Sequence, residues 1–207
     1  PTVGLWNMAR FAETLLPILS KDSDTAIQIA ETRLAKFMPT FQSSFYTGLR
    51  QKLGIKEHSK NANEFSDDTL NMLGKNSIDM TVFFDTLTKI AFGASEQTLF
   101  ELFNEKDYAQ QWLTKWQVLR AENSDTPKNM RLANPAIIAR NHRVEEALLA
   151  ASTQNDLAPL SRLVKALQNP FHCTPENTDL QKPPSLKERV KETFCGTSVS
   201  YTHLTLP

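Results

Sequence analysis

Residues 30–49 read AETRLAKFMPTFQSSFYTGL, and the apolar side chains in this stretch recur at helical intervals. From Ala30 onward they are spaced by four, three, four, four and four residues, which is the longest clean period in the chain. Such spacing places side chains on one face of an α-helix. Pro39 lies inside the stretch, so the sequence predicts a kink or two helices that meet there. Gly54 follows and predicts the C-terminal end of the helix.

Three phenylalanines of this stretch, Phe37, Phe41 and Phe45, are four residues apart. Together they make a continuous apolar face on the predicted helix, and we expect this face to pack inside the protein. If Phe41 is fully buried, its replacement by alanine should cost about 3–5 kcal/mol of stability.

Helical spacing of apolar residues continues on both sides of this stretch. Asp79 precedes one such run, and Asn134-Pro135 joins a capping residue to a proline suited to the first helical position. No sustained alternation of period two occurs between residues 1 and 197, so the predicted fold class is mainly α. The further predicted helical stretches are 6–19, 70–73, 80–91, 99–103, 108–119, 144–151 and 157–167.

The sequence also suggests three parts of different character. Residues 1–168 form the helical portion, whereas 169–197 are proline-rich and predict an extended segment. Residues 198–207 look like a non-native tail, because Val199 to Pro207 resemble one reading frame of a common transposon-end sequencing adapter.

Composition excludes several classes of protein. The chain has 207 residues, of which 40% are hydrophobic and 22% charged, so it should bury a core. Its 23 basic and 23 acidic residues give no net charge, which argues against a nucleic-acid partner. No apolar run reaches a membrane-spanning length of about 18 residues. Two cysteines suit a reducing compartment, and the six scattered glycines form no phosphate-binding loop.

Few residues are candidates for chemistry. His172-Cys173 together with Cys195 are conceivable metal ligands, but adjacent ligands without a second spaced pair match a structural zinc site poorly. Trp112 and Trp116, with a tyrosine four residues earlier, lie on one helical face. They are able to stack on a ligand, but core packing is the favoured interpretation.

A dense polar cluster occupies residues 140–143 (RNHR), followed by Glu145 and Glu146. In one interpretation, Arg140 and Arg143 contact phosphates. In the favoured interpretation, the two arginines pair with the glutamates or with a helix end, each at about 0–1 kcal/mol.

Three segments together resemble the selenoprotein O (YdiU) family of pseudokinase-fold protein adenylyltransferases. They are residues 4–17 (GLWNMARFAETLLP), 134–148 (NPAIIARNHRVEEAL) and the ending 193–197 (TFCGT). Their order and separation match as well, and the resemblance covers about residues 1–197.

The resemblance implies a protein-kinase-like fold and the transfer of AMP from ATP to Ser, Thr or Tyr hydroxyls of other proteins, with Mg²⁺ or Mn²⁺. The family's Gly-rich loop, strand lysine, base aspartate and metal-binding residues precede the segment that resembles residues 4–17. The chain begins PTVGLW, without Met or a leader, and we expect it to be the C-terminal part of a longer protein. It therefore carries no catalytic, cofactor-binding or metal residue that we can name, and it should neither bind ATP nor transfer AMP alone.

The family's C-terminal tail often carries a redox-active Cys or selenocysteine, and Cys195 is the nearest match here. Position 198 is Ser, so a tail dithiol is not available, and Cys195 is only a candidate redox residue.

The leading hypothesis is thus the helical C-terminal part of a bacterial, cytoplasmic protein adenylyltransferase whose partners are substrate proteins, without nucleic acid or membrane. One alternative is a non-enzymatic helical protein-interaction module whose aromatic faces bind a partner. A third is a metal-dependent helical enzyme that uses His172 and Cys173.

Overall fold

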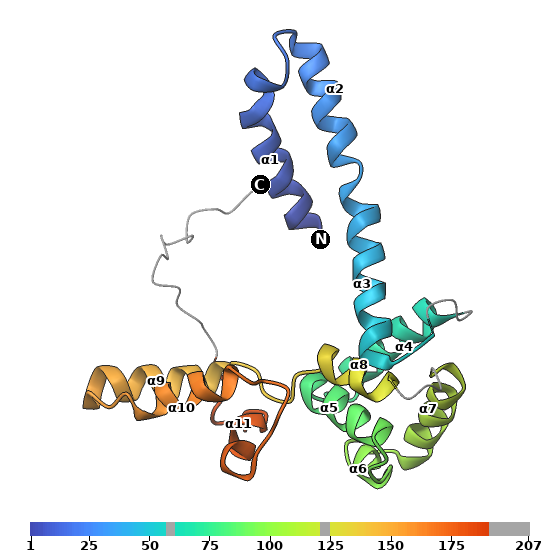
Figure 1. The fold of residues 1–207 in the computed structure, drawn as a ribbon, viewed down its shortest axis with the longest axis vertical. Helices are drawn as coiled ribbons and strands as arrows, with labels where there is room; N and C mark the ends of the chain where they lie inside the picture. The colour runs from blue at the N-terminus through green and yellow to red at the C-terminus, as the bar shows by residue number, and fades with distance from the viewer. Residues whose placement is uncertain (57–60, 121–124, 191–207) are drawn as a thin grey trace. The chain divides into compact units, whose positions relative to one another are not determined.

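The structure is a computed structural model that describes residues 1–56, 61–120 and 125–190. These residues form helices joined by short connections, and the sole β-type pairing within them is an isolated antiparallel bridge between Ile55 and Arg120 (Figure 1). The mainly α fold class is therefore confirmed. The elements are α1 Thr2–Leu19, α2 Ser23–Leu34, α3 Phe37–Leu53, α4 Ala62–Lys75, α5 Met80–Ala91, α6 Gln97–Phe100, α7 Lys106–Leu119, α8 Thr126–Ala133, α9 Asn141–Gln154, α10 Ala158–Leu167, the 3-10 turn η1 Pro175–Asn177 and α11 Thr178–Gln181.

The chain divides into two compact units, and each is made of two stretches of sequence. The first unit comprises Pro1–Gly74 and Asp107–Ala133, and the second comprises Lys75–Lys106 and the chain from Asn134 onward. Within the described ranges, no helix is both long and apolar enough to cross a membrane.

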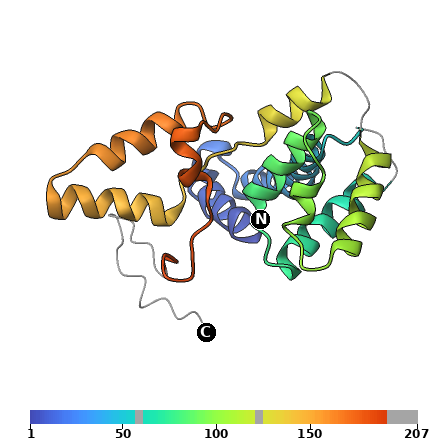
Figure 2. The ribbon, with the colours of Figure 1, turned by 90° about the horizontal axis from the view of Figure 1, so that it is seen from below.

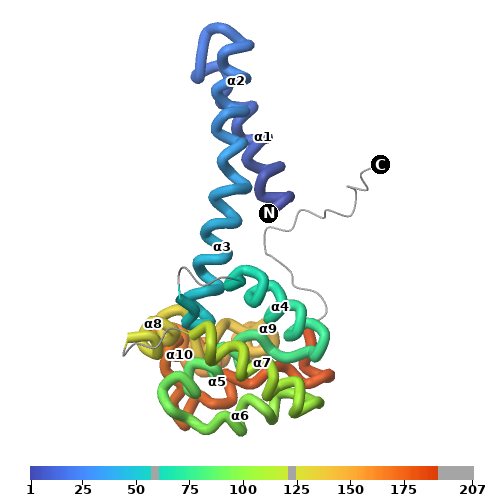
Figure 3. The backbone as a smooth tube through the Cα atoms, turned by 90° about the vertical axis from the view of Figure 1, so that its right-hand side faces the viewer, coloured from blue at the N-terminus to red at the C-terminus, as the bar shows by residue number. Residues whose placement is uncertain are grey.

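The first unit begins with a helical hairpin. α1 lies antiparallel beside α2, and α3 continues from α2 in nearly the same direction (Figure 3). The break between α2 and α3 falls at residues 35–36, so the two helices predicted to meet near Pro39 are present. Pro39 itself lies in the first turn of α3, where a missing backbone N–H breaks no intrahelical bond.

The C-terminal end of α3 is fixed by Gly54, as its sequence position predicted. Gly54 has a φ of 63°, a left-handed conformation that an L side chain adopts only with strain. A Cβ atom added there would also lie 2.6 Å from the sulfur of Met130 in α8. Both the backbone conformation and the close approach of α8 therefore require glycine at this position.

The core of the first unit is built around two indole rings of α7. Trp112 and Trp116 stack on each other with centroids 6.4 Å apart, and Phe65 of α4 stacks on Trp112 at 5.4 Å. Each indole has a hydrogen-bond partner: Trp112 Nε1 donates to Thr69 Oγ1 at 3.2 Å, and Trp116 Nε1 donates to the carbonyl oxygen of Leu53 at 2.7 Å. Both tryptophans are buried, so the core-packing interpretation is correct for them.

The phenylalanine stripe of α3 is not buried in this chain, contrary to expectation. Phe41 is 37% exposed and Phe45 is 40% exposed, although the rings of Phe37, Phe41 and Phe45 stack on one another along the helix. The periodicity gave the helix and the shared face correctly. It did not show that helix α1 covers only part of that face, next to Phe37, and leaves Phe41 and Phe45 partly exposed.

The second unit has its apolar core in two parts. Phe83, Phe84 and Leu87 of α5 are fully buried. Further along, α9 and α10 lie side by side and antiparallel (Figure 2), and Leu163 of α10 packs in a cluster with Ile137. The remaining members of that cluster are Ala136, Ala166 and Leu180.

Asn134-Pro135 does not begin a helix, which corrects the prediction. The next helix, α9, begins at Asn141, and residues 134–140 precede it in non-helical form. The buried amide of Asn134 donates to Thr88 Oγ1 at 2.9 Å instead of capping a helix. A tertiary hydrogen bond has therefore replaced the local cap. Residues 169–190, expected to be extended, include the short helical elements η1 and α11.

Candidate functional site

The polar cluster around residues 140–143 is held by an ion pair with the start of α5. Asp79 caps α5, because its Oδ1 accepts the backbone N–H of Val82 at 2.9 Å. Arg140 Nη1 and Nη2 donate to the two carboxylate oxygens of Asp79 at 2.8 and 2.9 Å. The Arg140 side chain is only 6% exposed and that of Asp79 is 25% exposed, so this bidentate pair is partly removed from water.

The pKa of the Asp79 carboxyl reflects this arrangement. Burial by itself raises the pKa, but the hydrogen bonds from Arg140 and Val82 and the charge of Arg140 lower it more. The net result is a pKa below the ordinary value, so Asp79 is ionised at neutral pH and serves as a counter-ion.

Two more arginines are engaged within the second unit. Arg143 Nη1 donates to Glu146 Oε2 at 2.7 Å, as the favoured sequence interpretation proposed. Arg162 makes a bidentate pair with Asp179, and its hydrogen bond lowers the pKa of that carboxyl. These guanidinium groups therefore already have carboxylate partners.

His142 is buried within this cluster. Its Nε2, like Arg140 Nε and Arg143 Nε, is a buried nitrogen without a hydrogen-bond partner among the described residues. The pKa of His142 is lowered, first by burial and then by the charge of Arg143. Glu188 and Glu146 oppose this shift, and Arg140 adds to it. Neutral pH thus leaves the imidazole uncharged beside two cations.

A polar cavity of about 450 Å³ lies between α10 and the segment that follows it in the second unit. Arg162 lines it and is paired with Asp179, while Thr174 and Asn177 line it and hydrogen-bond to each other. Lys165 and His172 complete its basic lining, and Glu176 brings a negative charge. The cavity is therefore of mixed charge, and no single sign dominates it.

Of the three residues considered as metal ligands, only His172 and Cys173 lie within the described residues. His172 lies at the polar cavity, and Cys173 is a free, partly buried thiol whose pKa is raised mainly by burial. Within residues 1–56, 61–120 and 125–190, no three His, Cys, Asp or Glu side chains converge in a way that would hold a metal ion. Cys195, the candidate redox residue, and the tail from residue 198 lie outside the described residues.

Three aspartates of the second unit already have polar partners. This matters for magnesium binding, because a carboxylate must be free to ligate the metal. Asp79 and Asp179 are engaged by arginines, and the buried Asp85 is held by Lys89 at 2.7 Å and by Gln181 at 2.8 Å.

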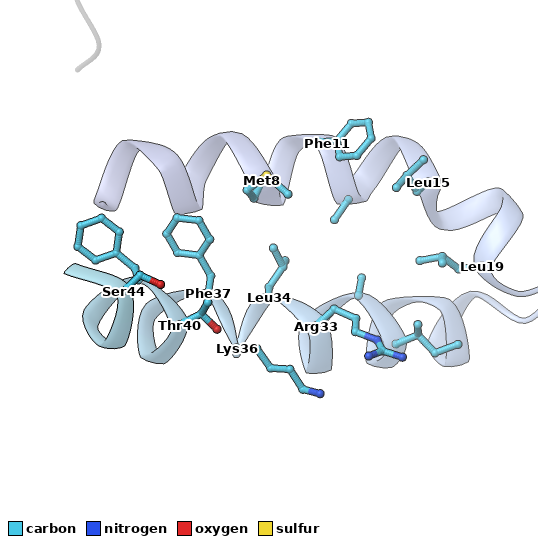
Figure 4. Close-up of a pocket in the computed structure, with 14 residues that line it drawn as sticks. Met8, Phe11, Leu15, Leu19, Arg33, Leu34, Lys36, Phe37, Thr40 and Ser44 are labelled. Carbon is cyan, nitrogen blue, oxygen red and sulfur yellow. The ribbon is translucent and has the colours of Figure 1, made fainter. Parts of the chain in front are cut away.

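The first unit carries a feature that the sequence did not predict, an apolar groove between α1 and the α2–α3 pair. Its volume is about 710 Å³. Figure 4 shows the side chains of Leu34 and Phe37 pointing toward α1 across this groove. The complete lining is Met8, Phe11, Ala12, Leu15, Leu19, Ile29, Ala30, Arg33, Leu34, Lys36, Phe37, Thr40, Phe41 and Ser44.

Sequence comparison places this chain among known proteins. The sequence model of the family "Protein adenylyltransferase SelO" matches residues 1–168. The chain belongs to this family. The SelO-family chain is 36% identical over 201 residues to a protein nucleotidyltransferase YdiU of Maridesulfovibrio salexigens, a match that covers 95% of this chain and 40% of that relative.

Other relatives give the same picture for the SelO-family chain. A protein nucleotidyltransferase YdiU of Rhodopseudomonas palustris is 39% identical over 202 residues, which is 95% of this chain and 41% of the relative. One of Bacillus cytotoxicus is 39% identical over 201 residues, with 95% and 40% covered. The chain thus spans about two fifths of the length of the curated relatives that it matches.

The names of the family and of these relatives are those of nucleotidyltransferases. Within the second unit, the Arg140–Asp79 pair joins the chain before α9 to the start of α5, which is a structural role for the polar cluster. Sequence reasoning missed the Asp79–Arg140 pair because the two residues are 61 positions apart. The phenylalanine stripe in the sequence could have indicated the groove, but it was interpreted as part of the hydrophobic core.

Proposed function

We propose that this chain is the helical part of a protein adenylyltransferase. In the proposed reaction, a Ser, Thr or Tyr hydroxyl oxygen of a substrate protein bonds to the α-phosphorus of ATP. The bond from that phosphorus to the α–β bridging oxygen breaks, pyrophosphate leaves, and the hydroxyl proton passes to a base. The match of the family model over residues 1–168 is the observation that carries this proposal.

The proposal places the nucleotide, Mg²⁺ or Mn²⁺, and the catalytic base in the part of the family's length that this chain does not span. Two observations support that placement: the matches cover about two fifths of each relative, and two aspartates of the second unit, Asp79 and Asp179, are engaged by arginines. The kinase-like fold and the bacterial cytoplasm as location belong to the same proposal.

A transfer assay tests the proposal. The genomic reading frame around this sequence is expressed whole and incubated with Mg²⁺, acceptor proteins and ATP labelled on either the α- or the γ-phosphate. Label from α-labelled ATP alone is expected on protein, because AMP is transferred and pyrophosphate leaves. The 207-residue chain should transfer nothing.

The outcomes separate the alternatives. Label from γ-labelled ATP would indicate phosphorylation and contradict adenylyl transfer. Transfer by the 207-residue chain would contradict the placement of the catalytic groups. Absence of transfer by the whole protein would favour the interaction-module alternative, for which the exposed apolar groove is the supporting observation.

A further inference from the structure

Helix α1 buries none of its residues within the described chain, although its sequence is rich in large apolar side chains. Trp6 is 60% exposed and Phe11 is 55% exposed, and Met8 is also open to solvent. A helix in a small domain normally buries its apolar stripe against the rest of the protein. The contacts of α1 with α2 therefore do not account for its composition.

Two of these exposed side chains, Met8 and Phe11, line the groove between α1 and the α2–α3 pair, whereas Trp6 lies outside it. Ten of its fourteen lining residues are apolar, and they come from all three helices. The polar lining groups are Thr40, Ser44, Arg33 and Lys36, so no acidic residue is present. Contiguous apolar surface of this kind marks a place where another part of a protein docks.

A small molecule is a poor occupant of this groove. Small-molecule sites combine apolar walls with a few converging polar groups that orient the ligand. The charged lining groups, Arg33 and Lys36, both come from the α2–α3 side, and the α1 wall offers only apolar lining residues. The groove thus fits a protein segment with an apolar ridge.

A second copy of this chain is also a poor occupant. In a twofold dimer the same patch faces itself, so Arg33 and Lys36 of both copies would enter one interface. Like charges brought together in an interface oppose binding. An occupant with acidic groups beside its apolar ridge would complement the two cations instead.

The relatives indicate where such an occupant comes from. The match covers 40% of the Maridesulfovibrio salexigens relative, which leaves 60% of that protein outside it. We infer that the α1–α3 groove is the docking seat for this remaining part of the family's chain, through an apolar ridge flanked by acidic side chains. The inference rests on family membership and on the groove, and it does not depend on the proposed adenylyl transfer.

Co-purification tests this inference. The 207-residue chain carrying an affinity tag is co-expressed with the part of the Maridesulfovibrio salexigens relative that lies outside the match. A one-to-one complex is expected. Phe11→Asp on the α1 wall and Phe41→Asp on the α3 wall should each lower its recovery at least tenfold, because a carboxylate cannot be buried there without a partner.

Ile18→Asp is the matched control, since Ile18 lies on the same helix α1, is 79% exposed and does not line the groove. It should leave the recovery of the complex unchanged. Circular dichroism of each variant chain shows whether its helices are intact, and a variant that has unfolded is replaced by the milder Phe11→Ser.

Three results would overturn the inference: no complex with the unaltered chain, equal recovery with Phe11→Asp and Ile18→Asp, or a groove-dependent dimer in sedimentation in place of the complex. The readout involves no nucleotide. A complex that forms but transfers no AMP would therefore count against the proposed function alone.

Discussion

Trp116→Phe isolates one hydrogen bond that closes the end of α3. Leu53 is the last residue of α3, and its carbonyl belongs to the last turn, where no intrahelical donor is available. Leu53 is fully buried, so no water reaches its carbonyl oxygen to donate a hydrogen bond. The indole N–H of Trp116 donates to this oxygen at 2.7 Å. Phenylalanine would keep an aromatic ring at position 116 but has no donor.

The expected loss of stability arises because the Leu53 carbonyl oxygen is left without a hydrogen-bond donor. Leaving a buried carbonyl without a partner costs about 1–3 kcal/mol. For a chain of this length, each kcal/mol shifts the melting temperature by about 2–4 °C, so Trp116→Phe should lower it by roughly 2–12 °C. Trp116→Ala adds a cavity and should cost about 3–5 kcal/mol in total.

Thermal unfolding followed by circular dichroism measures this effect, and Trp6→Phe is the matched control. Trp6 is 60% exposed, with Arg10 5.8 Å above its ring, so its replacement should change stability by no more than about 0.5 kcal/mol. Equal melting temperatures for Trp116→Phe and Trp6→Phe would refute the reasoning, because the indole N–H would then contribute nothing to the end of α3.

Three further changes test other features. Asp79→Asn keeps a capping side chain on α5 but leaves the buried Arg140 without its counter-ion, and it should cost about 3–5 kcal/mol in urea unfolding. Because the pKa of His142 is lowered on folding, the unfolded chain binds more protons, so stability should fall as pH drops through about 6.5. His142→Gln should remove that pH dependence. Gly54→Ala should destabilise α3 by at least about 1 kcal/mol, whereas Gly48→Ala, with open space around it, should be neutral or stabilising.

Each of these three predictions has a result that contradicts it. Glu146→Gln is the control for Asp79→Asn. It removes an exposed partner of Arg143 and should cost no more than about 1 kcal/mol. If Asp79→Asn lost no more stability than this control, burial of the Asp79–Arg140 pair would be unimportant. A pH dependence that persists in His142→Gln would assign the titration to another group. Equal melting temperatures for Gly54→Ala and Gly48→Ala would refute the role of the left-handed backbone.

Local chemistry determined what the sequence predicted correctly. Gly54 ends α3 and Asp79 caps α5 because both effects act within one helical turn. Asn134-Pro135 had the right local chemistry for a helix start. However, the Asn134 side-chain amide donates a buried hydrogen bond to Thr88, 46 positions away, and caps no helix. Such a partner leaves no trace in the nearby sequence.

Periodicity showed which side chains share a face, but not what covers that face. Phe41 and Phe45 lie on one stripe as predicted, yet both are partly exposed in the described chain. The carboxylate partner of Arg140 was predicted to lie nearby and instead comes from the start of α5. The mainly α class survived these errors because it depends on spacing alone.

The connectivity of the two units has a consequence for synthesis on the ribosome. The chain leaves the first unit after Gly74, returns to it at Asp107 and leaves it again after Ala133. The indole rings that fill the core of the first unit belong to the returning stretch, so residues 1–74 emerge before the side chains that they pack against. Domains fold as units during translation. The nascent first unit must therefore wait for residues 107–133, and no single cleavage point divides the polypeptide into its two units.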